Sequence, residues 1–307
     1  MIEVPEHLKG RDFTRVSAWA PEELETVLDL ADELKVARTR GEPVALLPGR
    51  TLGMIFQKPS TRTRVSFEVG IAQLGGLGLY LSASDLQLGR GETIKDTANV
   101  LSRYLDAIMI RTFDQAEVEE LAEHADVPVI NGLTDSEHPC QALADLMTIR
   151  ERLGRLSGVR LAFIGDGNNV CVSLMAAAAA FGMRFAAATP PGYAPPPGEV
   201  ARWGDAVELT TDPREAARGA DVLYTDVWTS MGQEEERARR LEDFRGFAID
   251  SALLALSAED AIVLHCLPAH YGEEITEEVL YGPQSAVWDE AENRLHAQKA
   301  LMALIIP

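Results

Sequence analysis

The sequence has few cysteines and no long apolar run, and each shortage excludes a class of protein. Its three cysteines, Cys140, Cys171 and Cys266, lie far apart and form no Cys-x-x-Cys pair. An odd, scattered set of this kind predicts neither a disulfide framework nor a zinc knuckle. The longest apolar run, around residues 174–183, is too short to cross a bilayer. The amino terminus has no apolar stretch behind a basic start, so we expect a cytoplasmic protein with no membrane association.

Basic residues are also scarce. The 307-residue chain contains 28 Lys and Arg against 48 Asp and Glu, which gives a formal net charge of −20. Such a chain repels DNA, RNA and anionic lipid unless basic residues concentrate locally, so we expect no nucleic-acid partner. Hydrophobic residues make up 46% of the chain, which argues against disorder, and its length predicts roughly two domains.

A short apolar run, a polar turn and a segment with helical spacing recur along the chain in that order. This alternation is typical of the α/β class. In the first half we expect strands at 51–56, 105–110 and 127–131, and helices at 65–74, 115–125 and 139–153. In the second half we expect strands at 158–164, 184–188, 221–225 and 261–265, a helix ending at 181, and a last helix from about 289 to 306. Helix 139–153 is the expected bridge between the halves.

The first strand is followed by the segment Lys58-Pro-Ser-Thr-Arg-Thr-Arg64. In an open parallel sheet, ligands bind beyond the carboxyl ends of the strands. Hydroxyl groups, guanidinium groups and free N–H groups at a helix start together match the geometry of a phosphate. The other interpretation is an ordinary Ser or Thr helix cap beside surface arginines.

Further polar residues stand at comparable positions in the first half and near the end of the chain. Arg111 directly follows a strand, and the motif His138-Pro-Cys-Gln141 opens a helix. Arg294 lies near the start of the last helix and is a third candidate cation. Each of these residues alone is as compatible with a structural role as with a functional one.

Three segments of the second half carry polar side chains after apolar runs. Gly165-Asp-Gly-Asn-Asn169 resembles the start of a dinucleotide fingerprint but lacks its third glycine. Asp226-Val-Trp-Thr-Ser-Met-Gly232 follows one strand, and His265-Cys266-Leu-Pro268 ends another. Adjacent residues on a strand point to opposite faces, so we do not expect His265 to activate Cys266. The spacing completes no recognised metal-ligand set, and we expect no metal site.

Read in order, these segments closely resemble the aspartate and ornithine transcarbamoylase family, and within it the ornithine-specific members. The segment Ser60 to Arg64 resembles the carbamoyl-phosphate loop, and His138 to Gln141 the His-Pro-x-Gln motif. The segment Asp226 to Gly232 resembles the ornithine signature, and His265 to Pro268 a later loop. The likeness runs from about Thr51 to Leu301 and includes the tail around Arg294. Gln57 and Cys140 depart from the usual pattern without removing a group that the resemblance assigns to chemistry.

The resemblance implies a particular domain organisation. It predicts two doubly wound α/β domains with parallel sheets and a C-terminal helix that crosses back to the first domain. Residues 1–137, completed by the helix at about 289–307, are expected to bind carbamoyl phosphate. Residues 138–153 would form the linking helix, and residues 154–288 the ornithine-binding domain.

The resemblance also assigns roles to residues in the transfer of a carbamoyl group to the δ-amine of L-ornithine, which gives L-citrulline and phosphate in arginine metabolism. It implies that Arg111, His138, Cys266 and Arg294 act in catalysis and that no cofactor is needed. The carbamoyl-phosphate set is Ser60, Thr61, Arg62, Thr63, Gln87, Arg111, His138, Gln141, Cys266, Leu267 and Arg294. The ornithine set is Asn169, Asp226, Ser230 and Met231.

The segment from Ser84 to Gly91 resembles a loop that enters a neighbouring subunit's site, with Gln87 as the contact residue. The resemblance therefore implies a homo-oligomer, either a trimer or a multiple of trimers. A mobile surface loop is the other interpretation, which the glycines of this segment suit equally well.

Three other functions compete with this hypothesis. A carbamoyltransferase for putrescine, aspartate or an acylated ornithine would share the phosphate site and differ in the second half. A dinucleotide-binding protein built on Gly165 to Asn169 would leave the cluster from Ser60 to Arg64 unexplained. A catalytically silent paralogue would keep the fold without turnover.

Overall fold

The structure is a computed structural model that describes residues 4–87, 91–230, 232 and 234–307. The chain divides into two compact units. Unit 1 comprises Met1–Met147 and Glu292–Pro307, and unit 2 comprises Thr148–Ala291. The C-terminal segment thus belongs to the first unit, as expected. No helix among the described residues has the length and apolar character that a membrane span requires.

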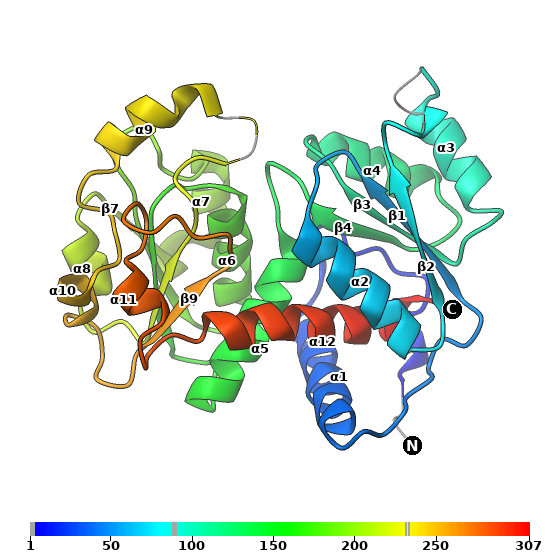
Figure 1. Cartoon of the computed structure of the whole chain (residues 1–307), viewed down its shortest axis with the longest axis horizontal. Helices are drawn as coiled ribbons and strands as arrows, with labels where there is room; N and C mark the ends of the chain where they lie inside the picture. The colour runs from blue at the N-terminus through cyan, green and yellow to red at the C-terminus, as the bar shows by residue number, and fades with distance from the viewer. Residues whose placement is uncertain (1–3, 88–90, 231, 233) are drawn as a thin grey trace. The chain divides into compact units, whose positions relative to one another are not determined.

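Unit 1 is built on a four-stranded parallel sheet with the strand order β2-β1-β3-β4 (Figure 1). The strands are β1 (Thr51–Phe56), β2 (Leu77–Ser82), β3 (Ala107–Arg111) and β4 (Val129–Leu133). Its helical segments are η1 (Glu6–Leu8), η2 (Val16–Ala18), α1 (Pro21–Thr39), α2 (Thr61–Gln73), α3 (Ile94–Leu101), α4 (Gln115–His124), most of α5 (Pro139–Leu153) up to Met147, and α12 (Val287–Ile305) from Glu292 onward.

Unit 2 is built on a five-stranded parallel sheet with the strand order β7-β6-β5-β8-β9. The strands are β5 (Arg160–Ile164), β6 (Arg184–Ala188), β7 (Val207–Thr210), β8 (Val222–Thr225) and β9 (Ile262–His265). Its helical segments, besides the ends of α5 and α12, are α6 (Asn169–Ala180), α7 (Pro197–Trp203), η4 (Gly204–Ala206), α8 (Pro213–Ala217), η5 (Glu234–Glu236), α9 (Arg237–Asp243), α10 (Ser251–Leu254) and α11 (Glu277–Leu280).

Strands β3, β4, β8 and β9 are buried along their whole length, because helices cover parallel sheets on both faces. In unit 1, Ile108 and Ile110 of β3 pack with Val118 and Leu121 of α4 in one apolar cluster. In unit 2 the sheet packs against a cluster that includes Trp228. The predicted α/β fold with two parallel sheets is therefore confirmed.

Most predicted elements agree with the structure, and α5 and β6 have the predicted bounds. The first residue predicted for the helix after β1 is wrong. We expected it at Val65, but α2 begins four residues earlier, at Thr61. The hydroxyl of Ser60 caps it by accepting the N–H of Thr63 at 3.2 Å. Helix α1 and the strands β2 and β7, each at one edge of its sheet, were not predicted from the sequence. Both strands are partly exposed, and Glu208 interrupts the apolar residues of β7.

The turn between β5 and α6 requires a glycine. A Cβ at Gly167 would lie 2.2 Å from the backbone nitrogen of Pro195, so the loop at Pro195 would have to move. We predict that Gly167→Ala destabilises the protein by about 1–3 kcal/mol, because overpacking against backbone is poorly relieved. Gly198→Ala is the matched control: a Cβ there meets nothing within 4 Å, so its effect should lie between zero and a stabilisation of about 1 kcal/mol. Urea unfolding of both variants measures the difference, and equal midpoints would contradict the prediction.

Candidate functional site

The first turn of α2 carries the sequence Thr61-Arg-Thr-Arg64 and no acidic residue. Helix starts favour negative side chains, because the free N–H groups and the helix dipole are positive there. Arginines in this turn work against that preference unless an anion binds beside them. The amino terminus of α2, at the carboxyl end of β1, therefore has the chemistry of an anion site.

Two buried arginines converge on one hydroxyl in this turn. The Oγ1 of Thr63 accepts a hydrogen bond from Nη1 of Arg111 at 3.3 Å and another from Nη2 of Arg294 at 3.3 Å. Arg111 is the last residue of β3, Arg294 lies in α12, and both side chains are almost inaccessible to water. Two like charges buried this close repel each other, and a bound anion would relieve the repulsion.

Arg294 is fixed in place by two glutamines. Its Nη1 donates to Oε1 of Gln141 at 2.7 Å, and its Nε donates to Oε1 of Gln298 at 2.9 Å. The amide of Gln141 in turn donates to Asp145 at 2.8 Å. Gln141 was among the predicted site residues, but Gln298 was not, although it has the helical spacing of four residues from Arg294.

His138 is buried directly before α5. Burial lowers the pKa of His138 well below its usual range, and the charges of Arg294, Arg111 and Arg62 lower it further. The imidazole is therefore neutral at physiological pH, in which state one ring nitrogen donates a hydrogen bond and the other accepts one. Burial also raises the pKa of the neighbouring Cys140 thiol to about 12, so that this cysteine is no nucleophile.

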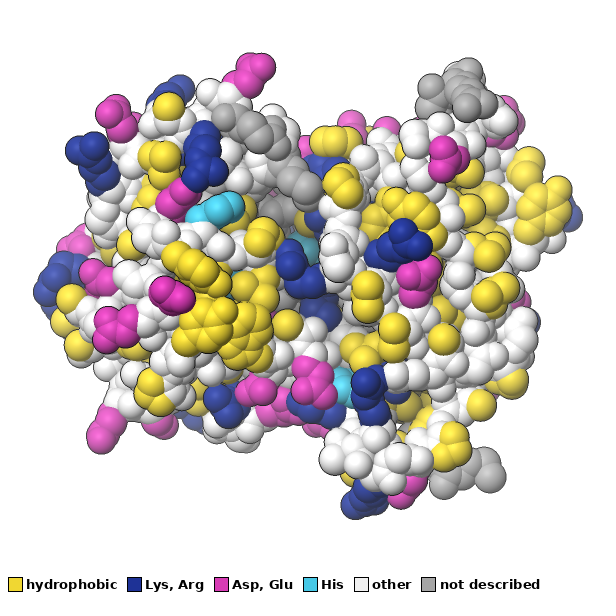
Figure 2. Space-filling view, viewed as in Figure 1, with side chains coloured by type: hydrophobic (Ala, Val, Ile, Leu, Met, Phe, Trp, Pro, Cys, Tyr) yellow, Lys and Arg dark blue, Asp and Glu magenta, His cyan; other side chains and the backbone are white. Residues whose placement is uncertain are grey.

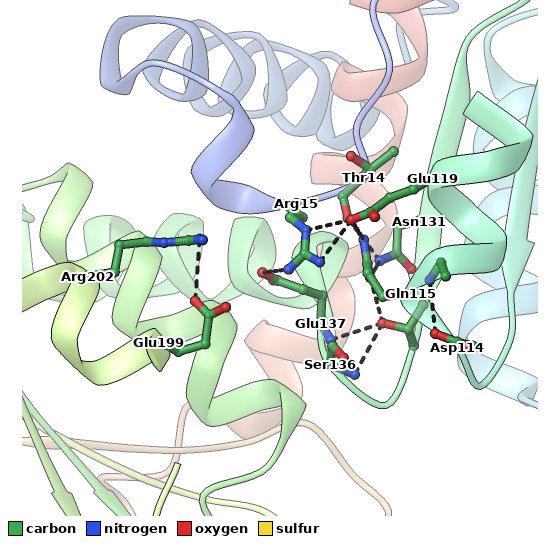
Figure 3. Close-up of polar contacts among 12 residues, drawn as sticks. Thr14, Arg15, Asp114, Gln115, Glu119, Asn131, Ser136, Glu137, Glu199 and Arg202 are labelled. Atoms are coloured by element: carbon green, nitrogen blue, oxygen red, sulfur yellow. Dashed lines mark hydrogen bonds and ion pairs between the residues drawn. The ribbon is translucent and has the colours of Figure 1, made fainter. Parts of the chain in front are cut away.

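A buried polar network holds the turn that precedes His138 (Figure 3). The Oε1 of Gln115 accepts hydrogen bonds from Thr134 at 2.8 Å and Asn131 at 3.2 Å. The hydroxyl of Thr134 also accepts the backbone N–H of Glu137 at 3.0 Å. Arg15 lies 2.9 Å from Glu119 and 3.6 Å from the buried carboxylate of Glu137. These contacts fix the backbone that carries His138 into α5.

Arg64 does not join the cations around Thr63. It lies over the ring of Tyr80, 4.0 Å from the centroid, and donates to Glu68 at 3.3 Å. Gln87 is exposed, and part of the segment around it, residues 88–90, lies outside the described residues. Lys58 was not among the predicted site residues; it is buried, pairs with Asp135, and lies 4.2 Å from the ring centroid of Phe113.

A carboxylate fixed by three donors stands at the carboxyl end of β8 in unit 2. The Oδ1 of Asp226 accepts the thiol of Cys266 at 3.0 Å and the N–H of Val227 at 2.8 Å. Its Oδ2 accepts the amide of Asn168 at 2.7 Å. These contacts hold the carboxylate in one orientation, in a position to bind a cationic group.

Asp226 contacts Asn168, the neighbour of the predicted ornithine residue Asn169. Asn168, which was not predicted as a site residue, both caps α6 and contacts Asp226, whereas the Oδ1 of Asn169 accepts the N–H of Val170 at 2.9 Å. Ser230 is partly buried in the segment after β8, and Met231 lies outside the described residues.

Arg240 is a further residue that the sequence analysis missed. Its Nη1 donates to Asp166 at 2.7 Å and to the backbone oxygen of Trp228 at 2.9 Å. It thereby ties α9 to the turns that follow β5 and β8. Burial raises the pKa of Asp166, and the positive charge of Arg240 acts in the opposite direction.

His265 and Cys266 contact different partners, as strand alternation predicts. The Nε2 of His265 lies 3.1 Å from Oε1 of Glu274, and its Nδ1 accepts the backbone N–H of Leu267 at 2.9 Å. The thiol of Cys266 donates to Asp226 instead. Leu267 has a φ of 58°, a left-handed conformation that is unusual for any residue other than glycine.

Both units match models of one protein family. Residues 11–151 match the carbamoyl-P binding domain of aspartate/ornithine carbamoyltransferase, and residues 157–305 match its Asp/Orn binding domain. The chain belongs to the aspartate/ornithine carbamoyltransferase family. The turn at Gly165 to Asn169, considered above as a dinucleotide fingerprint, lies in the Asp/Orn binding domain of this family.

Individual members of the carbamoyltransferase family are similar over nearly the whole chain. The ornithine carbamoyltransferase of Carboxydothermus hydrogenoformans is 57% identical, over 97% of this chain and 98% of its own. That of Symbiobacterium thermophilum is 58% identical, over 97% and 99%. The solved structure of the Pyrococcus furiosus ornithine carbamoyltransferase superposes with a TM-score of 0.94 at 52% identity and covers 99% of both chains.

The lowered pKa of His138 predicts a pH-dependent stability. The unfolded chain binds a proton at this imidazole below its ordinary pKa of about 6.5, whereas the folded protein does so only at much lower pH. The free energy of unfolding contributed by His138 therefore falls as the pH drops, by about 1 kcal/mol between pH 7 and pH 5.5. Urea unfolding at both pH values measures this loss. His138→Asn should lose about 1 kcal/mol less over the same interval, and an identical pH dependence in both proteins would contradict the prediction.

Proposed function

We propose that this protein transfers the carbamoyl group of carbamoyl phosphate to the δ-amine of L-ornithine, which gives L-citrulline and phosphate. The observation that carries the proposal is the convergence of Arg111 and Arg294 on Thr63 at the start of α2. Thr63 and Arg111 lie in the range that matches the carbamoyl-P binding domain, and Arg294 lies in the C-terminal segment of the same compact unit. The relatives of highest identity reported above are named ornithine carbamoyltransferases, which supports ornithine as the amine.

The start of α2 binds the phosphate of carbamoyl phosphate in this proposal. Ser60, Thr61, Arg62 and Thr63 supply hydroxyl, guanidinium and backbone N–H donors, which suit a dianion at a helix amino terminus. Arg111 reaches both the phosphate and the carbonyl oxygen. Its charge stabilises the negative charge that builds on the tetrahedral intermediate and on the departing phosphate.

The carbamoyl group is oriented by residues that meet around Arg294. The neutral imidazole of His138 donates a hydrogen bond to the carbonyl oxygen, and Gln141 and Arg294 complete its polar surroundings. A neutral donor suits this role because it adds no further positive charge to a site that already holds three guanidinium groups. The low pKa of His138 supports the assignment.

The ornithine molecule is bound through residues of unit 2. Asp226 accepts hydrogen bonds from the α-ammonium group, and Asn169, Ser230 and Met231 bind the amino-acid end. Cys266 and the backbone of Leu267 act on the δ-nitrogen and the carbamoyl group. The fixed orientation of the Asp226 carboxylate supports a role in recognising a cation.

The active unit is a homo-oligomer, a trimer or a multiple of trimers, in which Gln87 contributes to the site of a neighbouring subunit. An exposed apolar face on unit 1 supports association, since such a face is costly to leave in water. Figure 2 shows hydrophobic side chains gathered at the surface over α2 and β2. The exposed apolar residues of these two elements are Val65, Val69, Leu77, Leu79 and Tyr80.

The choice of amine tests the proposed function directly. Purified protein with carbamoyl phosphate is offered L-ornithine, L-aspartate, putrescine or N-acetylornithine, and we expect citrulline from ornithine and no product from the others. Asp226→Asn should raise the KM for ornithine about 10- to 100-fold, because a neutral amide replaces a charged acceptor. Asp221→Asn, at the opposite end of β8, is the matched control and should leave this KM unchanged. Turnover of another amine in place of ornithine would contradict the proposal.

Subunit mixing tests the shared site. Arg111→Ala alone should lower kcat by about 10²- to 10³-fold through loss of charge stabilisation, and Gln87→Ala alone should also be impaired. When equal amounts are unfolded and reassembled together, about one quarter of the sites in a closed ring would combine an intact Arg111 with a neighbour's intact Gln87. Activity should then rise toward about one quarter of the wild-type value, on the same random-mixing count. Activity no greater than the average of the two variants would contradict a site shared between subunits.

A further inference from the structure

A cavity of about 270 Å³ lies at the amino ends of three neighbouring strands of unit 2, β5, β6 and β7. Asp226 follows the carboxyl end of β8, so the cavity is at the opposite edge of the same sheet from the proposed ornithine residues. The residues that line it include Arg160, Arg184, Ala186, Asp205, Ala206 and Glu208.

The register of the strands explains why the sheet is hollowed here. Arg160 pairs with Arg184 and Ala186 pairs with Glu208. Paired residues on neighbouring strands, and residues two apart on one strand, lie on the same face of a sheet, so these four side chains share a face. Ala186 belongs to the same apolar cluster as the alanines of α8, which therefore covers this face. With five residues, α8 is about 7.5 Å long and leaves the amino ends of the strands uncovered.

The charged groups around the cavity do not satisfy one another. The side chains of Arg184 and Asp205 form no hydrogen bond or ion pair with any residue that the structure describes. The Nε of Arg160 is shielded from water and has no hydrogen-bond partner among the described residues. Its Nη2 lies 3.8 Å from Oε2 of Glu208, which is too long for a hydrogen bond. Two guanidinium groups and two carboxylates are therefore available to a ligand.

We propose that this cavity binds the zwitterion of a small α-amino acid with an uncharged aliphatic side chain, at a site separate from the proposed ornithine site. Its carboxylate accepts hydrogen bonds from Arg160 and Arg184, and its ammonium group donates to Asp205 and Glu208. The methyl group of Ala186 offers an apolar surface to the aliphatic side chain.

The balance of charge selects a zwitterion over an ion of one sign. The two positive and two negative side chains of the lining cancel. A simple anion would face Asp205 and Glu208 in a protein whose net charge is −20, and a simple cation would face both guanidinium groups. The volume lies just below the usual range for ligand pockets, about 300–1,000 Å³, so the cavity suits a small molecule.

Three probes of similar shape test the charge requirement by titration calorimetry on the full chain. L-valine carries both charges, isobutylamine lacks the carboxylate, and isovalerate lacks the ammonium group. We expect one L-valine to bind per chain. Each analogue should bind about 10- to 100-fold more weakly, because it loses the hydrogen bonds of one charged group.

Variants of the lining locate the site. Arg184→Gln and Asp205→Asn should each weaken the binding of L-valine about 10- to 100-fold, for the same reason. Arg218→Gln and Asp260→Asn are the matched controls, since they remove the same charges from exposed positions of unit 2 outside the cavity. Their affinity for L-valine should equal that of wild type. All four residues are exposed, so the variants should fold like wild type.

A methyl signal gives a second readout at the cavity itself. In protein with ¹³C-methyl alanine, the signal of Ala206 is identified by comparison with Ala206→Gly. L-valine should shift this signal in wild type, and should leave it in place in Arg184→Gln at the same concentration.

Four results would overturn the inference: no binding of L-valine to wild type, equal binding of either analogue, an equal loss in the control variants, or unchanged affinity in both cavity variants. The last result is the one expected if L-valine occupied the proposed ornithine site alone. All of these measurements are made without carbamoyl phosphate, so a failure to carbamoylate ornithine would overturn the proposed function and leave this test intact.

Discussion

The burial of two guanidinium groups against one threonine hydroxyl is the constraint on which the rest of unit 1 depends. Arg111 ends the central strand β3, and α12 returns to unit 1 with Arg294. Gln141 and Gln298 then hold Arg294 by hydrogen bonds at both sides of its guanidinium group. Segments far apart in the sequence are therefore required at one place, in a protein whose net charge is −20. The parallel sheet supplies that place, because its strands end together.

Unit 2 fixes a side chain of the opposite charge in a similar way. Asp226 also follows a buried strand, and donors from three separate segments fix both of its oxygens. In each unit, a charged side chain at a strand end is immobilised before any ligand arrives, so little conformational freedom remains to be lost on binding. The sheets thus act as rigid supports for groups of opposite sign, one suited to an anion and the other to an ammonium group.

The sequence predicted the parts of this structure that leave a local signal. Strands such as β3 and β8 are continuous apolar runs because both of their faces are covered, whereas β2 and β7 are partly exposed. The polar motifs at strand ends were also visible. Asn168, Arg240 and Glu274 were not, since each acquires its partner only through the tertiary fold: Arg240 and Asp166 are 74 residues apart. The start of α2 was misplaced because its basic first turn contradicts the usual preference for acidic residues.

One turn of α12 carries residues that matter to both units. Glu290, which accepts the backbone N–H of His265, belongs to unit 2, and Arg294, four residues later, belongs to unit 1. Each residue of an α-helix adds a rotation of about 100°, so the four residues from Glu290 to Arg294 make a little more than one turn. A short piece of one helix therefore supplies a hydrogen-bond acceptor to the end of β9 in unit 2 and a guanidinium group to the start of α2 in unit 1.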